Sequence, residues 1–175
     1  MTDEHTPGIT PRTTPEPGHT LITSRSEFHT GLRSAFAEAA AQGCREIWLC
    51  DIDYADWPLN EPELIEHLTH WAKAYRKLTL IAQHFDEFPR RHARWVAWRR
   101  TWSHIVECRA NVELEAGKMP TMLLAPGLVT VRLVDPVRYR GSVSHVPADA
   151  IHGRELIDAV LQRSEEAFPV TSLGL

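Results

Sequence analysis

Apolar positions recur along the chain at two spacings, and together they predict alternating strands and helices. Residues 46–50 (EIWLC) and 77–82 (KLTLIA) are continuous apolar runs of strand length, and the first is typical of a strand buried on both faces. Apolar residues at helical spacing predict one helix over about residues 27–42 and another that begins at Asn60 or Glu61. A helix, a strand, a helix and a strand therefore alternate in the first half of the chain.

The second half of the chain predicts a longer helix that feeds a strand. The helix begins near Pro89 and carries Trp95, Trp98 and Trp102 on one face, which favours packing in the core or at a subunit interface. Residues 105–109 (IVECR) follow it and predict the strand.

A hairpin and a last helix complete the predicted elements. Residues 119–124 and 128–134 predict two strands, because the Ala-Pro-Gly sequence between them is a tight-turn signal. Residues 137–146 have the composition of a loop, and residues 149–167 predict a helix with Ile151 on its inner face.

This order predicts an α/β fold in which helices flank one mixed sheet. Residues 21–175 have the length and composition of a single domain. Residues 1–20 contain four prolines and little that can be buried, so they predict a disordered or loosely packed N-terminal tail.

Composition narrows the class of protein. A net charge of −4 argues against nucleic-acid binding over the whole surface, although it allows a local basic patch. The three cysteines, Cys44, Cys50 and Cys108, form no CxxC pair, so we expect buried thiols in a cytoplasmic protein rather than zinc ligands or disulfides. No apolar run reaches the roughly 18 residues of a membrane span.

Several common catalytic and cofactor motifs are absent. The chain has no GxGxxG and no GxxxxGK[ST], which excludes a dinucleotide fingerprint and a P-loop. It has no GxSxG nucleophile elbow and no HExxH zinc motif. The sequence therefore predicts no cofactor and identifies no catalytic residue.

Acidic side chains follow the strand at residues 46–50. Asp51, Asp53 and Asp56 lie where open α/β sheets place their sites, and carboxylate oxygens suit divalent cations. They are metal-ligand candidates, with a polar loop that caps the next helix as the alternative.

Arginines form the second candidate site. They would hold phosphate or carboxylate groups through bidentate contacts, or they would pair with acidic residues on a solvated face. The anion-binding candidates are Arg90, Arg91, Arg94, Arg99, Arg138 and Arg140.

Two resemblances add to these patterns. The order of elements, with EIWLCDIDYADWPL, KLTLIA and the hairpin, resembles one half of a phospholipase-D-like domain. The stretches RWVAWRRTWSHIVECR and RSEEAFPVTSLGL are similar to an uncharacterised bacterial domain family. The resemblance covers about residues 21–175. The likeness to the phospholipase D superfamily implies a homodimer, because half-domains of that superfamily commonly pair. The likeness to the bacterial family implies an acetyltransferase-like protein as a partner.

The phospholipase D resemblance also implies where a catalytic motif would stand. Active members carry HxKxxxxD, whose histidine attacks phosphorus, and the motif would lie near the hairpin. Residues 120–124 (PTMLL) contain neither histidine nor lysine, so the active site is expected to be degenerate.

We therefore expect a non-catalytic binding or interaction module whose ligand is a phosphate-containing molecule or nucleic acid. One alternative is a metal-assisted hydrolase or transferase that uses the three aspartates, or a histidine such as His84, His104 or His145 as general base. Another is a structural accessory to an acetyltransferase-like enzyme.

Overall fold

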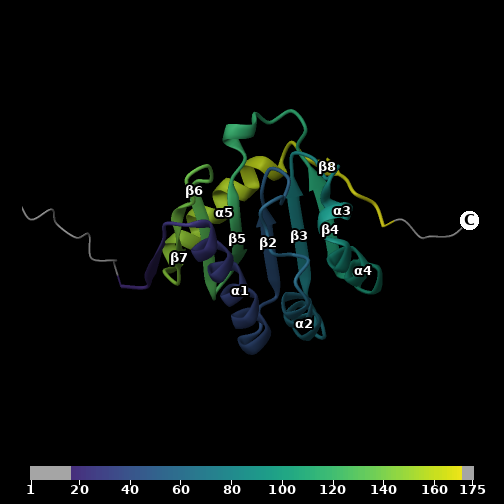
Figure 1. Cartoon of the computed structure of the whole chain (residues 1–175), viewed down its shortest axis with the longest axis horizontal. Helices are drawn as coiled ribbons and strands as arrows, with labels where there is room; N and C mark the ends of the chain where they lie inside the picture. The colour runs from purple at the N-terminus through teal and green to yellow at the C-terminus, as the bar shows by residue number, and fades with distance from the viewer. Residues whose placement is uncertain (1–16, 171–175) are drawn as a thin grey trace, which may run out of the picture.

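A computed structural model describes residues 17–170 of the 175-residue chain. Within that range the chain forms one eight-stranded sheet in the order β1-β7-β6-β5-β2-β3-β4-β8 (Figure 1). The strands are β1 (His19–Ile22), β2 (Glu46–Cys50), β3 (Lys77–Ala82), β4 (Val106–Ala110), β5 (Thr121–Ala125), β6 (Val129–Asp135), β7 (Arg140–Ser144) and β8 (Glu165–Glu166). The helices are α1 (Arg25–Gln42), α2 (Pro62–Trp71), α3 (Phe88–Arg91), α4 (Ala93–Trp102), α5 (Pro147–Leu161) and two short 3₁₀ turns, η1 (Ser103–Ile105) and η2 (Ala116–Lys118).

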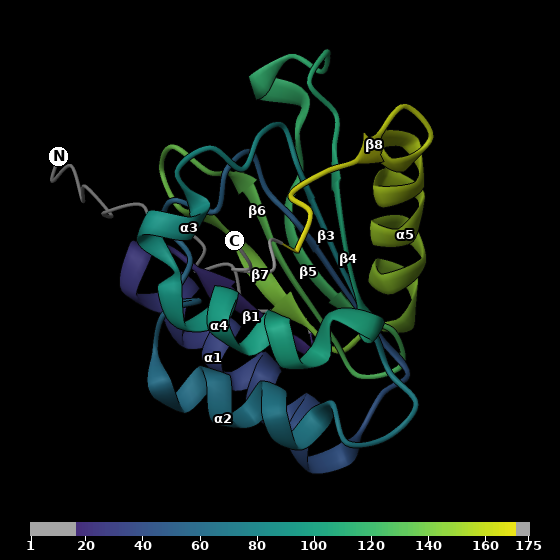
Figure 2. The ribbon, with the colours of Figure 1, turned by 90° about the vertical axis from the view of Figure 1, so that its right-hand side faces the viewer.

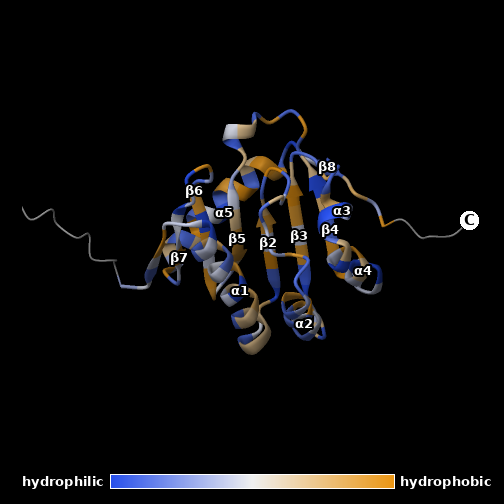
Figure 3. Cartoon of the chain, in the orientation of Figure 1, coloured by the Kyte–Doolittle hydropathy of each residue, from blue (hydrophilic) through white to orange (hydrophobic). Residues whose placement is uncertain are grey.

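The sheet is mixed, as predicted, because β2, β3 and β4 run parallel while β5, β6 and β7 continue antiparallel. Helices α1, α2 and α4 cover one face and α5 lies on the other (Figure 2). In Figure 3, β2 and β3 are apolar over most of their length and become hydrophilic at their amino-terminal ends. The core therefore lies in two layers around the central strands.

Strand β2 shows how the sequence produces these layers. Its side chains alternate, so Ile47 and Leu49 join the core under α1 and α2, whereas Trp48 and Cys50 join the core under α5. The strand is buried on both faces, which confirms the interpretation of its continuous apolar run.

Helix α1 begins and ends where local signals place it. The Ser24 hydroxyl accepts a hydrogen bond from the backbone N–H of Glu27 at 3.1 Å, which satisfies one free donor of the first turn. At the other end Gly43 has a φ of 76°, and its N–H donates to the carbonyl of Ala39 at 2.9 Å.

The prediction of a single helix from near Pro89 is wrong, because the helix is interrupted at His92 and forms two helices, α3 and α4. His92 leaves helical geometry with a φ of −126° and a ψ of 51°. Its Nε2 hydrogen-bonds the carbonyl oxygen of Tyr54 at 2.8 Å, and its ring packs on Phe88. A long-range contact therefore sets the break, with no glycine there to signal it.

Three other expectations are also wrong. Residues 137–146 contain strand β7 instead of a loop throughout. The last helix ends at Leu161 rather than 167. Ile151, expected to face inward on that helix, is 65% exposed.

Two expectations about buried side chains are confirmed. Trp95 and Trp98 lie in the core, while Trp102 is half-buried at the end of α4. The three cysteines are buried and unpaired, and burial raises the pKa of Cys108 to about 12. None of the helices in residues 17–170 has both the length and the apolarity needed to cross a lipid bilayer.

Candidate functional site

The carboxyl end of β2, the start of β5 and the end of β6 border a pocket of about 480 Å³, which we call the strand-end pocket. Its wall includes the three aspartates of the loop after β2, together with Lys118 and Arg132. At this edge β2 has a parallel neighbour on one side and an antiparallel neighbour on the other. The expected location of a site at this edge therefore coincides with a real hollow.

The carboxylate of Asp51 forms hydrogen bonds inside the protein. Its carboxylate is buried and accepts hydrogen bonds from the backbone N–H of Tyr54 at 2.8 Å and from the hydroxyl of Thr121 at 2.7 Å. Burial raises the pKa of Asp51, and these donors partly offset that effect. Asp51 thus ties the start of β5 to the loop after β2.

The other two aspartates are also engaged. Asp53 accepts from the backbone N–H of Ala55 at 3.0 Å. Asp56 accepts from the hydroxyl of Tyr139 at 2.6 Å, and this hydrogen bond is the main reason that its pKa is lowered. In residues 17–170 no three His, Cys, Asp or Glu side chains gather to hold a metal ion. Asp51 and Asp53 therefore stabilise the turn after β2 through backbone N–H groups of the same loop, and neither caps helix α2.

The stretch where the phospholipase D motif would stand forms part of the same pocket. Met119, Pro120 and Thr121 line it, and the Thr121 hydroxyl is directed to Asp51. Along the described chain no histidine lines this pocket. The histidines proposed as general bases lie apart: His84 is beside Asp86, His145 beside Glu38, and His104 at the opposite edge of the sheet.

The arginines predicted to bind anions do not converge. Arg90 and Arg91 lie on α3, whereas Arg138 and Arg140 flank the start of β7, several strands away (Figure 1). Most have their own partner: Arg90 pairs with Glu87, Arg94 donates to the carbonyl of Asn60, Arg138 pairs with Asp135, and Arg140 donates to the carbonyl of Thr23.

Arg99 has a different environment from the other arginines. It is 5% exposed, and its guanidinium lies 4.8 Å from the ring centre of Phe168 and donates to the carbonyl of the same residue. Arg99 therefore fastens the C-terminal segment to α4, and its burial withdraws it from an external anion.

A second hollow, of about 820 Å³, lies at the amino ends of β2 and β3, and we call it the amino-edge groove. Cationic and aromatic side chains dominate its wall. They are Arg45, Lys73, Arg76, Lys77, His104, Tyr75 and Trp102. None of the four Arg and Lys residues was a candidate in the sequence, although Lys73, Tyr75, Arg76 and Lys77 form a short basic run with an aromatic inside it.

Hydrogen bonds fix the frame of the amino-edge groove. The indole N–H of Trp71 donates to the carbonyl of Cys44 at 2.9 Å, and Arg76 Nε donates to the carbonyl of Trp71 at 3.0 Å. The backbone N–H of Lys77 donates to the carbonyl of Arg45 at 2.9 Å. Two separate connections of the chain, before β2 and before β3, are thereby held together.

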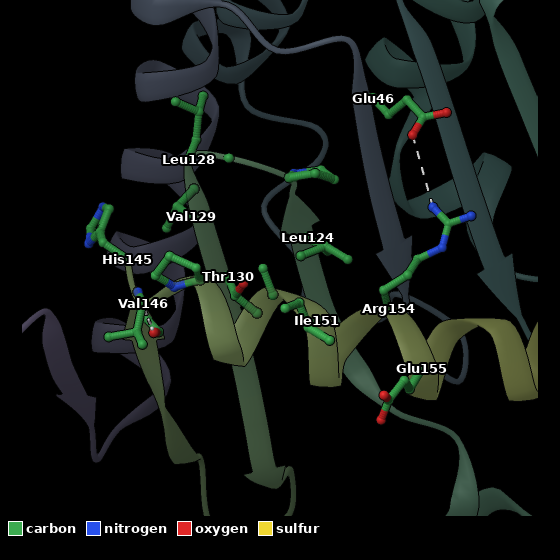
Figure 4. Close-up of a pocket in the computed structure, with 15 residues that line it drawn as sticks. Glu46, Leu124, Leu128, Val129, Thr130, His145, Val146, Ile151, Arg154 and Glu155 are labelled. Carbon is green, nitrogen blue, oxygen red and sulfur yellow. Dashed lines mark hydrogen bonds and ion pairs between the residues drawn. The ribbon is translucent and has the colours of Figure 1, made fainter.

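The charges of the amino-edge groove are unbalanced. Lys77 pairs with Glu107 at 3.3 Å, but in the described part of the chain Arg45 and Lys73 have no carboxylate partner. Glu46 is the carboxylate in the wall, and Arg154 lies 3.9 Å from it on the other side (Figure 4). The groove therefore presents net positive charge.

Figure 4 shows a third hollow, of about 550 Å³, beyond that Glu46–Arg154 pair. It lies between α5 and the β5–β6 hairpin. Leu124, Val129 and Ile151 give it a largely apolar wall. Glu46 thus separates a cationic groove from an apolar one.

No protein-family model and no curated protein matches the chain. Solved structures with a similar fold include the following two. One is TrmBL2, an archaeal chromatin protein whose structure shows a novel mode of DNA binding; the TM-score is 0.61 at 15% identity, over 89% of this chain and 57% of that one. The other is Nuc from Salmonella typhimurium, a phospholipase D family member; the TM-score is 0.56 at 9% identity, over 88% of this chain and 100% of that one. The chain therefore spans little more than half of TrmBL2, and its fold is phospholipase-D-like.

Proposed function

We propose that this protein is a non-catalytic binding module that holds phosphate-containing anions in the amino-edge groove. The observation that carries the proposal is the set of four Arg and Lys side chains in one wall, three of them without a carboxylate partner in residues 17–170. Guanidinium and ammonium groups are the side chains that bind phosphate oxygens in proteins.

The strand-end pocket supports the non-catalytic part of the proposal. The hydroxyl of Thr121 and the carboxylate of Asp51 are hydrogen-bonded to each other where the phospholipase D motif would supply its nucleophile. The DNA binding described for TrmBL2 is consistent with an anionic ligand on this fold, at an identity that transfers no residue.

Titration with inorganic polyphosphate at several salt concentrations tests the proposal. We expect binding that weakens linearly in a plot of log affinity against log salt, because each contact releases counterions. Arg45→Ala and Lys73→Ala should each weaken binding and lower the magnitude of the slope by up to about 1.

Arg90→Ala and Arg138→Ala serve as matched controls, because both side chains are exposed and lie away from the groove. Equal losses in the controls and in the groove variants would show that net charge, rather than the groove, governs binding. Absence of polyphosphate binding at low salt would reject the proposal.

A further inference from the structure

We infer that the anion held in the amino-edge groove is a single-stranded nucleic acid whose unpaired bases stack on Tyr75 and Trp102. This inference rests on the proposed function and adds the class of ligand. It depends on the aromatic side chains of the groove, whereas the proposed function depends on its cations.

Tyr75 is the first of the two stacking surfaces. It lies in the connection between α2 and β3, inside the basic run, and is 96% exposed. No aromatic ring of residues 17–170 packs on it. Both faces of the ring are therefore open to water, in a protein whose other two tyrosines hydrogen-bond to neighbouring groups.

Trp102 is the second surface, and the core holds it in place. Its ring stacks on Trp98 with centroids 6.4 Å apart and an interplanar angle of 27°, and Trp98 packs on the buried Trp95. His104 lies 6.0 Å from Trp102 on the groove side. A row of rings thus extends from the core to the groove, where the half-buried Trp102 and His104 form part of the wall.

The combination of cations and rings distinguishes between phosphate ligands. Sequence-tolerant single-strand binding uses a positive groove that follows the backbone and aromatic side chains on which bases stack. In a duplex the bases are already stacked on each other, so an exposed ring gains little. Polyphosphate has no bases, so it would contact only Arg45, Lys73, Arg76 and Lys77.

Fluorescence anisotropy with three ligands tests the inference: a labelled oligothymidylate, a labelled blunt duplex of equal length, and unlabelled polyphosphate as competitor. We expect the single strand to bind more tightly than the duplex. Tyr75→Ala should weaken single-strand binding by about 5- to 100-fold, the size of the alanine effect at a stacking aromatic. Tyr75→Phe, which keeps the ring, should bind the single strand as the wild type does, and the inhibition constant of polyphosphate should not change in either variant.

The outcomes separate this inference from the proposed function. If polyphosphate binds but Tyr75→Ala leaves single-strand affinity unchanged, or the duplex binds as tightly, the groove holds another phosphate ligand and the inference fails alone. If neither polyphosphate nor single strand binds, both fail. Tyr75 is a safe position for substitution because its side chain makes no contribution to the core.

Discussion

The hydroxyl of Tyr54 should stabilise the fold by an amount that one substitution can measure. Tyr54 is fully buried in the loop after β2, with a φ of 60° that places it in the left-handed region. Its hydroxyl donates to the carbonyl of Ile81 at 2.7 Å and accepts from the N–H of the same residue at 3.2 Å. Tyr54→Phe removes both bonds and keeps the ring that packs on Trp57, Phe85 and Phe88.

The expected loss follows from those two contacts. Removing a buried partner costs about 1–3 kcal/mol, because the remaining polar group loses its hydrogen bond without regaining water. The Ile81 carbonyl keeps a second donor, the N–H of Asp51 at 3.2 Å, which limits the cost on that side. For a chain of this length each kcal/mol lowers Tm by about 2–4 °C, so Tm should fall by about 2–12 °C.

Thermal unfolding followed by circular dichroism measures this change. Tyr75→Phe is the matched control, because it removes the hydroxyl of a tyrosine that is 96% exposed and should leave Tm unchanged. A Tyr54→Phe protein that melts with the wild type would mean that the two hydrogen bonds contribute no net stability, and the argument from burial would be wrong.

Two further variants test other parts of the structure. Gly141→Ala should destabilise the fold by at least about 2 kcal/mol in urea unfolding, because a Cβ there would lie 1.9 Å from the carbonyl oxygen of Arg132. Gly117→Ala is the control and should leave the stability unchanged, because the space around Gly117 is open. Equal stability of the two variants would contradict the register of β6 and β7. Burial lowers the pKa of His92 below 6.5, so the unfolded chain takes up a proton first, and the free energy of unfolding should fall as pH drops from about 7 through that folded-state pKa. His92→Gln should reduce this pH dependence, while an unchanged slope would assign it to other groups such as His29, whose pKa burial also lowers.

The sequence predicts those elements whose signals are local. Strand β2 follows from its continuous apolar run, and α1 follows from the Ser24 cap and the Gly43 stop. Strand β7 (RGSVS) was missed because its residues are polar or small and one of its two pairing partners, β1, lies far away in the sequence. The break at His92 depends on Tyr54, which no local pattern reveals.

The candidate sites show the same division between local and long-range information. The position of the aspartates at the end of β2 could be predicted, but the inward direction of Asp51 depends on Thr121, which β5 brings beside it. Arg45 and Lys73 belong to different connections, and only the parallel pairing of β2 with β3 places them in one groove. Residues 1–16, expected to form most of the N-terminal tail, lie outside the described part of the chain.

The pairing of β1 with β7 has a consequence for how the chain assembles during synthesis. Ile22 is among the first residues of the described chain to leave the ribosome, yet its partner in the sheet is Gly141. Strands β2, β3 and β4 are parallel neighbours in chain order and need only intervening helices to pair. Within the described chain, β1 is thus made early but among the last strands to find its place, and its contacts with β7 raise the contact order, which slows folding.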